Sequence, residues 1–140
     1  MVAKSIKEQG TMKVSRLTPS LLSVLRIVAA SLFLAHGTQK LFGVPGHPFH
    51  QPVFAMTLLF AAGVIEMFGG ALMWLGLFTR PAAFVLSGQM AVAFFTQHFP
   101  QGPWPILNGG ELAVLYCFLW LFFCVAGPGP ISLDKLRKRA

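Results

Sequence analysis

Charged residues are scarce in this sequence, and their scarcity argues against a water-soluble protein. The chain has 140 residues, of which 11% are charged and 55% are hydrophobic. A soluble globular domain carries about 25% charged residues. The shortfall is too large for a chain that must cover a folded domain with polar side chains, and the length indicates a single domain.

The sequence also lacks the motifs of most cofactor-dependent enzymes. It contains no Walker loop, nucleotide-binding fingerprint or Ser-His-Asp order. Its two cysteines, Cys117 and Cys124, are too far apart along one helix to form a disulfide with each other. His47 and His50 are close in sequence, but two histidines without further ligands make a weak metal site. We therefore predict no metal site.

Long apolar runs are what the sequence does contain. A membrane-spanning helix needs about 20 mostly apolar residues. The first run extends to Phe42, which is longer than the apolar part of a typical signal peptide, so cleavage is disfavoured. The fourth run is short unless residues 106–110 extend it. The four runs are Leu21–Phe42, Phe54–Phe78, Pro81–Phe99 and Glu111–Ala126.

The basic residues mark the cytoplasmic side of these runs. The connections 43–53 and 100–110 contain no Lys or Arg, whereas both ends of the chain are basic and Arg80 lies between the second and third runs. Cytoplasmic flanks carry the excess of Lys and Arg, so both termini are predicted to be cytoplasmic. The net charge of +7 is thereby assigned to flanks that touch anionic lipid, and nucleic acid is excluded as a partner.

These features predict an all-α membrane protein built as an antiparallel four-helix transmembrane bundle. Backbone groups in hydrocarbon must be paired within the segment, and the short connections make neighbouring helices antiparallel. Residues 1–18 are predicted to be a flexible basic cytoplasmic tail, 19–127 the transmembrane domain, and 128–140 a second basic cytoplasmic tail. The chain is thus predicted to cross a membrane four times.

Several polar residues fall inside the predicted spans, where they are costly and are therefore candidates for function. Arg26 and Glu66 lie at similar predicted depths, and we expect a buried ion pair between them. Gln89 is placed to donate a hydrogen bond to Glu66. The alternative role of these groups is to hold the helices together. Small residues on the face of the second run that carries Glu66 indicate that it points toward a neighbouring helix.

A second polar cluster is predicted toward the outer face. Its members come from three runs. His36, Gln39 and Lys40 share one side of the first run, Gln97 and His98 end the third, and Asn108 and Glu111 begin the fourth. Lys40 and Glu111 are plausible partners. The set predicts an outward-opening polar pocket, with an interfacial belt of solvated groups as the alternative. The candidate catalytic residues are Glu66, Arg26 and Glu111, and the candidate substrate-binding residues are His36, Lys40, Gln89, Asn108 and Glu111.

Three sequence patterns resemble the DoxX family of small membrane proteins. They are H-G-x-Q-K from His36, E-x-F-G-G from Glu66 followed by T-R-P-A from Thr79, and N-G-G-E from Asn108. The resemblance covers about residues 20–136. It implies a four-helix inner-membrane protein of the kind linked with quinol oxidase and thiosulfate–quinone oxidoreductase assemblies.

The resemblance leaves three functions open. The first is a quinone-linked oxidoreductase component acting on a small reductant such as a sulfur oxyanion. In that role the chain would need a bound quinone or an oxidoreductase partner subunit, soluble or membrane-bound, because it carries no redox motif. The second is a non-catalytic membrane subunit or assembly factor. The third is a small permease, which would require a homo-oligomer because four helices are few for a transport pathway.

Overall fold

The computed structural model describes residues 2–46 and 53–138, and side chains from 17 to 46 and from 57 to 138. Within these residues every regular element is helical, which confirms the predicted all-α class. His47 and His50 lie outside the described residues. The long helices are α1 (Val2–Phe42), α2 (Val53–Leu75), α3 (Thr79–Ala93) and α5 (Glu111–Ala126). The short elements are a π-helix, η1 (Phe94–His98), a 3₁₀-helix, η2 (Phe99–Gln101), and two short α-helices, α4 (Pro105–Asn108) and α6 (Leu133–Arg137).

The helix ends follow the predicted runs closely, with three differences. Residues 2–18, expected to form a flexible tail, continue the same helix as the first apolar run. The third run stays helical through η1 and η2 to Gln101. Residues 106–110 do not extend the fourth run, because Gly109 adopts a left-handed conformation with φ 67° and separates α4 from α5.

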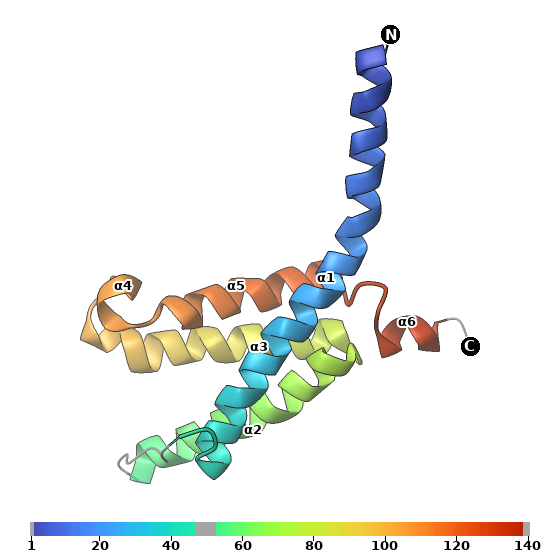
Figure 1. The fold of residues 1–140 in the computed structure, drawn as a ribbon. Helices are drawn as coiled ribbons and strands as arrows, with labels where there is room; N and C mark the ends of the chain where they lie inside the picture. The colour runs from blue at the N-terminus through green and yellow to red at the C-terminus, as the bar shows by residue number, and fades with distance from the viewer. Residues whose placement is uncertain (1, 47–52, 139–140) are drawn as a thin grey trace.

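The four long helices form two hairpins that diverge from a common end. The strongest packing is between α1 and α2 and between α3 and α5, whereas α2 and α3 touch less extensively. Figure 1 shows that α2 runs antiparallel to α1 and that α5 runs antiparallel to α3. The hairpins meet near the turn between α2 and α3, beside α6, and their far ends lie apart. This divergence leaves space between them for a cavity.

The hairpins are joined by an aromatic core. Phe33 of α1 packs against two rings of α5, with ring centroids 5.2 Å from Tyr116 and 5.3 Å from Trp120. Leu86 of α3 and Met73 of α2 are completely buried in the same cluster. Aromatic pairs of this kind contribute about 0.5–1.5 kcal/mol beyond the burial of their area, so this contact fixes one hairpin against the other.

Arg26 lies at the end of the molecule where the two hairpins meet, which we call the joined end. Its side chain is completely buried and donates to the backbone carbonyls of Met73 and Trp74, in the last turn of α2. Carbonyls at a helix C-terminus have no partner within the helix and favour a cation. The same guanidinium donates to the carbonyls of Pro128, at 3.0 Å, and Ile131, at 2.5 Å. Arg26 therefore binds α1, α2 and the C-terminal segment into one joint.

Asp134 completes this joint from the C-terminal segment. Its two carboxylate oxygens each accept a hydrogen bond of 2.9 Å, from the backbone amides of Phe78 and Thr79. These amides begin α3, where a negative charge is favourable. Burial acts to raise the pKa of Asp134, but the hydrogen bonds and the nearby charge of Arg137 outweigh it and hold the pKa below its ordinary value. The predicted second tail thus begins with a segment that is part of the fold.

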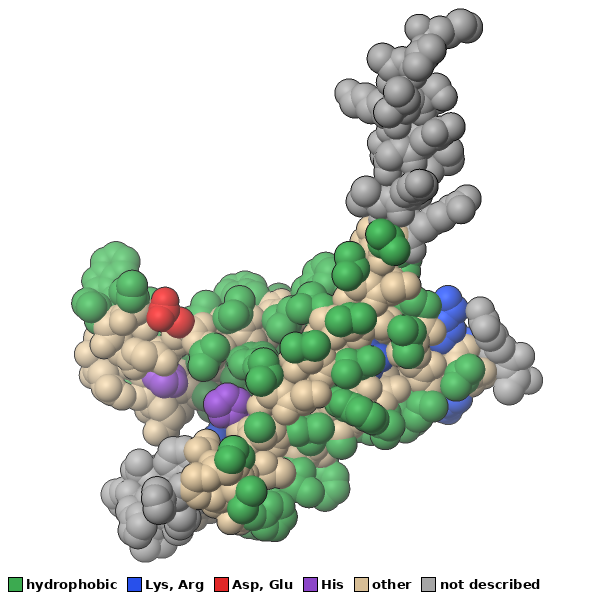
Figure 2. Space-filling model, in the orientation of Figure 1, with side chains coloured by type: hydrophobic (Ala, Val, Ile, Leu, Met, Phe, Trp, Pro, Cys, Tyr) green, Lys and Arg blue, Asp and Glu red, His purple; other side chains and the backbone are tan. Residues whose placement is uncertain are grey.

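The outer surface of the long helices is apolar. Two stretches, Leu17–Phe42 and Thr57–Leu75, are long and apolar enough to cross a membrane, and only 28% and 22% of their most apolar windows are buried. A core helix of a soluble protein would be mostly buried. Figure 2 shows apolar side chains over the middle of the molecule and most of the visible Lys and Arg near α6. This surface suits contact with lipid.

Close packing of α1 on α2 leads to a first prediction. A Cβ at Gly37 would lie 2.7 Å from the backbone nitrogen of Met67, which cannot move without shifting α2. We expect Gly37→Ala to destabilise the protein by about 1–3 kcal/mol, as overpacking does. Denaturation in mixed detergent micelles, followed by circular dichroism, measures this loss. Gly88→Ala is the matched control, because nothing lies within 4 Å of its added Cβ; equal stability of the two variants would contradict the close approach.

Candidate ligand-binding cavity

A cavity of about 660 Å³ lies between the two hairpins. Its walls come from α1, α2, α3, η1 and the start of α5, and most of the lining side chains are apolar. Leu58 of α2 and Val85 and Val92 of α3 line it and are also about half exposed. Ligand sites usually have volumes of about 300–1,000 Å³ and combine apolar walls with a few polar groups. The cavity has the size and the lining of such a site, and the exposed part of its lining includes these apolar residues together with His36, Thr96 and Gln97.

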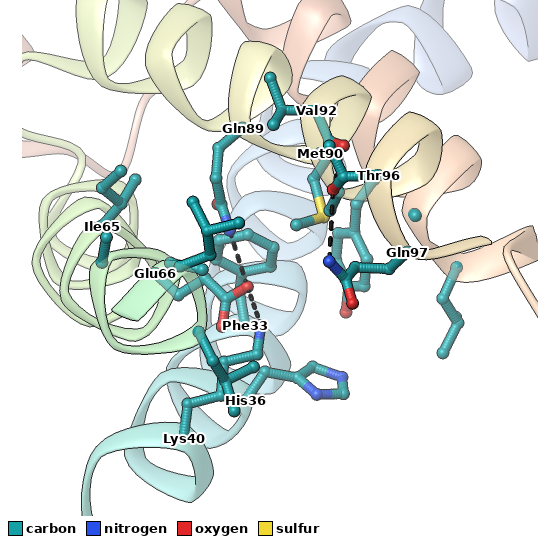
Figure 3. Close-up of a pocket in the computed structure, with 18 of the residues that line it drawn as sticks. Phe33, His36, Lys40, Ile65, Glu66, Gln89, Met90, Val92, Thr96 and Gln97 are labelled. Atoms are coloured by element: carbon teal, nitrogen blue, oxygen red, sulfur yellow. Dashed lines mark hydrogen bonds and ion pairs between the residues drawn. The ribbon is translucent and has the colours of Figure 1, made fainter. Parts of the chain in front are cut away.

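Three polar side chains from three helices meet in this cavity (Figure 3). Lys40 of α1 forms an ion pair with Oε1 of Glu66 on α2. Gln89 of α3 donates from its Nε2 to the same Oε1 at 2.9 Å, which confirms the predicted Gln89–Glu66 hydrogen bond. Glu66 is 1% exposed and Lys40 17% exposed. The carboxylate thus lies deep in the cavity and the ammonium nearer to its rim.

Two oxygens of this group have no hydrogen-bond partner among the described residues. Oε2 of Glu66 and Oε1 of Gln89 are both buried and unpaired. A buried acceptor without a partner costs about 1–3 kcal/mol, more when it is charged. Because both residues line the cavity, a bound molecule that donates hydrogen bonds would remove this cost.

A change in helix type shapes the rim of the cavity. After Ala93 the chain forms the π-helix η1, which brings Thr96, Gln97 and His98 to the cavity. π-helical turns occur often at functional sites. His98 is held by its Nδ1, 3.0 Å from the carbonyl oxygen of Asn108, and His36 of α1 is an exposed member of the lining.

Two predicted ion pairs are wrong. Arg26 does not pair with Glu66; it binds the carbonyls of α2 and the C-terminal segment, and it does not line the cavity. Lys40 does not pair with Glu111, because it is bound to Glu66. Both errors have one cause, the register of the first hairpin, in which α1 residues near Gly37 lie level with Met67. Glu66 is therefore closer to Lys40 than to Arg26.

The remaining candidates divide into two groups. His36, Lys40, Glu66 and Gln89 are brought together by the cavity. Asn108 and Glu111 are outside its lining. Asn108 organises the connection before α5, donating to the carbonyl of Gly102 at 2.6 Å and accepting from the amide of Gly110 at 2.8 Å. Glu111 is exposed in the first turn of α5, where an acidic residue favours helix formation.

Sequence reasoning missed part of the cavity wall. Tyr116 lines the cavity beside Phe33 and Met90, and its side chain is buried. It is the single tyrosine of the chain and carries a hydroxyl in the apolar part of α5 that follows Glu111, a signal that would have marked it. Thr96 was also missed, and it lines the cavity from within η1.

Helical hairpins with an apolar exterior and a polar group between them define a small helical membrane protein with an internal cavity. The chain belongs to the DoxX family, whose sequence pattern matches residues 21–99. It is also 46% identical over 121 residues to a protein of Haemophilus influenzae described as uncharacterized, a match covering 84% of this chain and 90% of that protein. No solved structure has a significant match to the chain.

Proposed function

We propose that this protein binds a quinol, or a similar amphipathic molecule with hydrogen-bond donors, in the cavity between its hairpins. The observation that carries the proposal is the pair of buried, unpaired acceptors on Glu66 and Gln89. The two hydroxyl groups of a quinol are donors, and a carboxylate is a suitable acceptor for a hydroxyl proton. The oxidised quinone offers only acceptors and would leave both oxygens unpaired.

The entrance and walls support the same ligand class. On the side of α2 and α3 the lining includes exposed apolar residues, Leu58, Val85 and Val92, and on this side a molecule dissolved in lipid would enter without crossing water. Phe33 and Tyr116 provide aromatic surfaces for a ring. Lys40 is neutralised by Glu66, which weakens the attraction of this site for a sulfur oxyanion and favours a neutral head group.

The proposal includes four membrane spans with cytoplasmic termini. Arg80 at the start of α3 and Trp104 after η2 lie at opposite ends of a helical stretch that continues from Thr79 to Gln101. Such a stretch has about the length of a bilayer core. The basic residues of α6 lie at the joined end with Arg80, as the distribution of Lys and Arg predicts for the cytoplasmic side. Cysteine-accessibility labelling at positions 80 and 104 tests this orientation.

Binding of decylubiquinol and decylubiquinone to the purified protein tests the ligand. We expect the quinol to bind more tightly than the quinone, and Glu66→Gln and Gln89→Leu to lose that preference by tenfold or more, about 1.4 kcal/mol. Glu111→Gln is the control, since Glu111 is exposed and outside the cavity. Absence of binding by either form, or a preference that survives both cavity substitutions, would refute the proposal.

A structural role is the second candidate, because the group formed by Lys40, Glu66 and Gln89 links α1, α2 and α3. In a non-catalytic subunit or assembly factor, this linkage would be the sole task of the polar residues. Glu66→Gln would then reduce the yield of folded protein, while any ligand affinity of the folded fraction stayed unchanged. Correcting the binding data for the folded fraction separates the two functions.

A further inference from the structure

A second cavity of about 660 Å³ lies at the joined end, on the side opposite the opening between the hairpins. It is bounded by the start of α3 and the C-terminal segment, and four basic residues line it: Arg80, Lys135, Arg137 and Lys138. Asp134 is the acidic residue of the lining. Because both its oxygens are bound to the amides of Phe78 and Thr79, its charge is directed into the start of α3. Asp134 offsets part of the charge of Arg137, a cation of the same lining, so the net charge of the cavity lining remains positive.

We propose that this cavity binds the phosphate head group of an anionic phospholipid from the surrounding membrane. Phosphate is the head-group chemistry that Arg and Lys recognise. The basic side chains are exposed, and Arg80 is within 3.4 Å of the carbonyl of Cys124 at the end of α5. Arg80 therefore links the start of α3 to the end of α5 at the edge of the cavity.

The surface next to the cavity suits the acyl chains of such a lipid. Phe84, one helical turn along α3 from Arg80, is 65% exposed, and Val125 at the end of α5 is 72% exposed. Farther along α3, the space around Gly88 is open. A free phosphate ion would use the cations but not this apolar surface. The combination of a basic cavity and an adjoining apolar face therefore favours a membrane lipid over a soluble anion.

Phe78 adds a contact at the boundary between these regions. It is a non-glycine residue with a positive φ, 49°, a conformation that costs energy for a bulky side chain. Its ring is half exposed and lies under the guanidinium of Arg137, 4.9 Å from the centroid. The ring is thus held beside the cations, between the basic cavity and the apolar surface of α3. The site is independent of the ligand proposed for the other cavity.

Native mass spectrometry of the detergent-purified protein tests this site. The protein is titrated with phosphatidylglycerol and, in parallel, with phosphatidylcholine of the same acyl chains. The test variant is Arg80→Gln/Lys135→Gln/Lys138→Gln, and the charge-matched control is Lys4→Gln/Lys7→Gln/Lys13→Gln. Each cation near a charged surface contributes about 1 kcal/mol, or roughly fivefold. We expect the test variant to bind phosphatidylglycerol ~10–100-fold more weakly, and the control to bind it nearly as the unmodified protein does.

A second variant and a competition measurement complete the test. The single charge reversal Lys138→Glu weakens binding of phosphatidylglycerol without altering the joint at Asp134, and it replaces the triple variant if that fails to fold. Inorganic phosphate is added as a competitor and is expected to leave the bound lipid in place. The proposal is overturned if the two lipids bind equally, if the test and control variants behave alike, or if inorganic phosphate displaces the lipid.

Discussion

Lys40→Met should destabilise the protein more than Glu66→Gln, although the two residues form one ion pair. The difference follows from their burial, since Glu66 is 1% exposed and Lys40 17% exposed. Without Lys40, a carboxylate remains deep in an apolar cavity, held only by the hydrogen bond from Gln89. Without the charge of Glu66, the long side chain of Lys40 can move its ammonium toward the rim.

Breaking a buried ion pair by removing one partner costs about 3–5 kcal/mol. We expect Lys40→Met to approach this range and Glu66→Gln to cost about 1 kcal/mol, because the glutamine keeps its contact with Gln89 while losing one charged hydrogen bond. The double variant Lys40→Met/Glu66→Gln should recover most of the loss, since neither charge is left unpaired. A double-mutant cycle isolates this coupling.

Unfolding of each variant in mixed detergent micelles, followed by circular dichroism, provides the measurement. His36→Ala serves as a control on the same face of α1, because His36 is an exposed member of the cavity lining. The ranking of the two single variants is the critical outcome. If Glu66→Gln is the more damaging change, or if the double variant is no better than Lys40→Met, the carboxylate is not the group that the pair stabilises.

The helices were largely predictable from the sequence because their apolar runs are set by the thickness of a bilayer. The fourth predicted run coincides with α5, Glu111–Ala126, and the second ends within three residues of α2 at Leu75. The π-helical turn after Ala93 was not predictable, because no local sequence signal distinguishes it from a continued α-helix. Thr96, which lines the cavity, lies within that turn.

The partners of the charged residues were not predictable, because they depend on how far α2 slides along α1. If the last residue of α1 lay level with the first residue of α2, Glu66 would lie level with the part of α1 near Arg26. The contact of Gly37 with Met67 instead shows α2 displaced by about two and a half turns. This displacement brings Glu66 to Lys40 and leaves Arg26 level with the end of α2, where the carbonyls of Met73 and Trp74 accept its hydrogen bonds.

Arg26→Met should prevent most of the protein from reaching its folded state. The methionine fills a similar volume but donates no hydrogen bond, so four carbonyls that now accept from Arg26 would lose that donor. The carbonyl of Met73 keeps a second hydrogen bond, from the amide of Gly76 at 3.1 Å, so the loss falls on the carbonyls of Trp74, Pro128 and Ile131. Each buried group left unpaired costs about 1–3 kcal/mol. The sum is comparable to the whole free energy of unfolding of a typical domain, about 5–15 kcal/mol.

Arg26→Lys distinguishes charge from geometry at the same position. Lysine keeps the positive charge at the end of α2, but a single ammonium cannot reach carbonyls on both α2 and the C-terminal segment as the planar guanidinium does. We expect its folded yield to be intermediate. Ser31→Ala, an exposed position on the same helix, should leave the yield unchanged. Size-exclusion chromatography of membrane extracts gives the folded yield of each variant.

Gly129→Ala tests the same joint from the other side. Gly129 has a positive φ of 77°, and a Cβ there would lie 2.3 Å from the hydroxyl oxygen of Ser23 on α1. The added methyl group would push the C-terminal segment off α1 and separate the carbonyls of Pro128 and Ile131 from Arg26. We therefore expect Gly129→Ala to lower the folded yield nearly as far as Arg26→Met. Normal yields for both variants would show that the hairpins are held together without this joint, by the aromatic contacts of Phe33 alone.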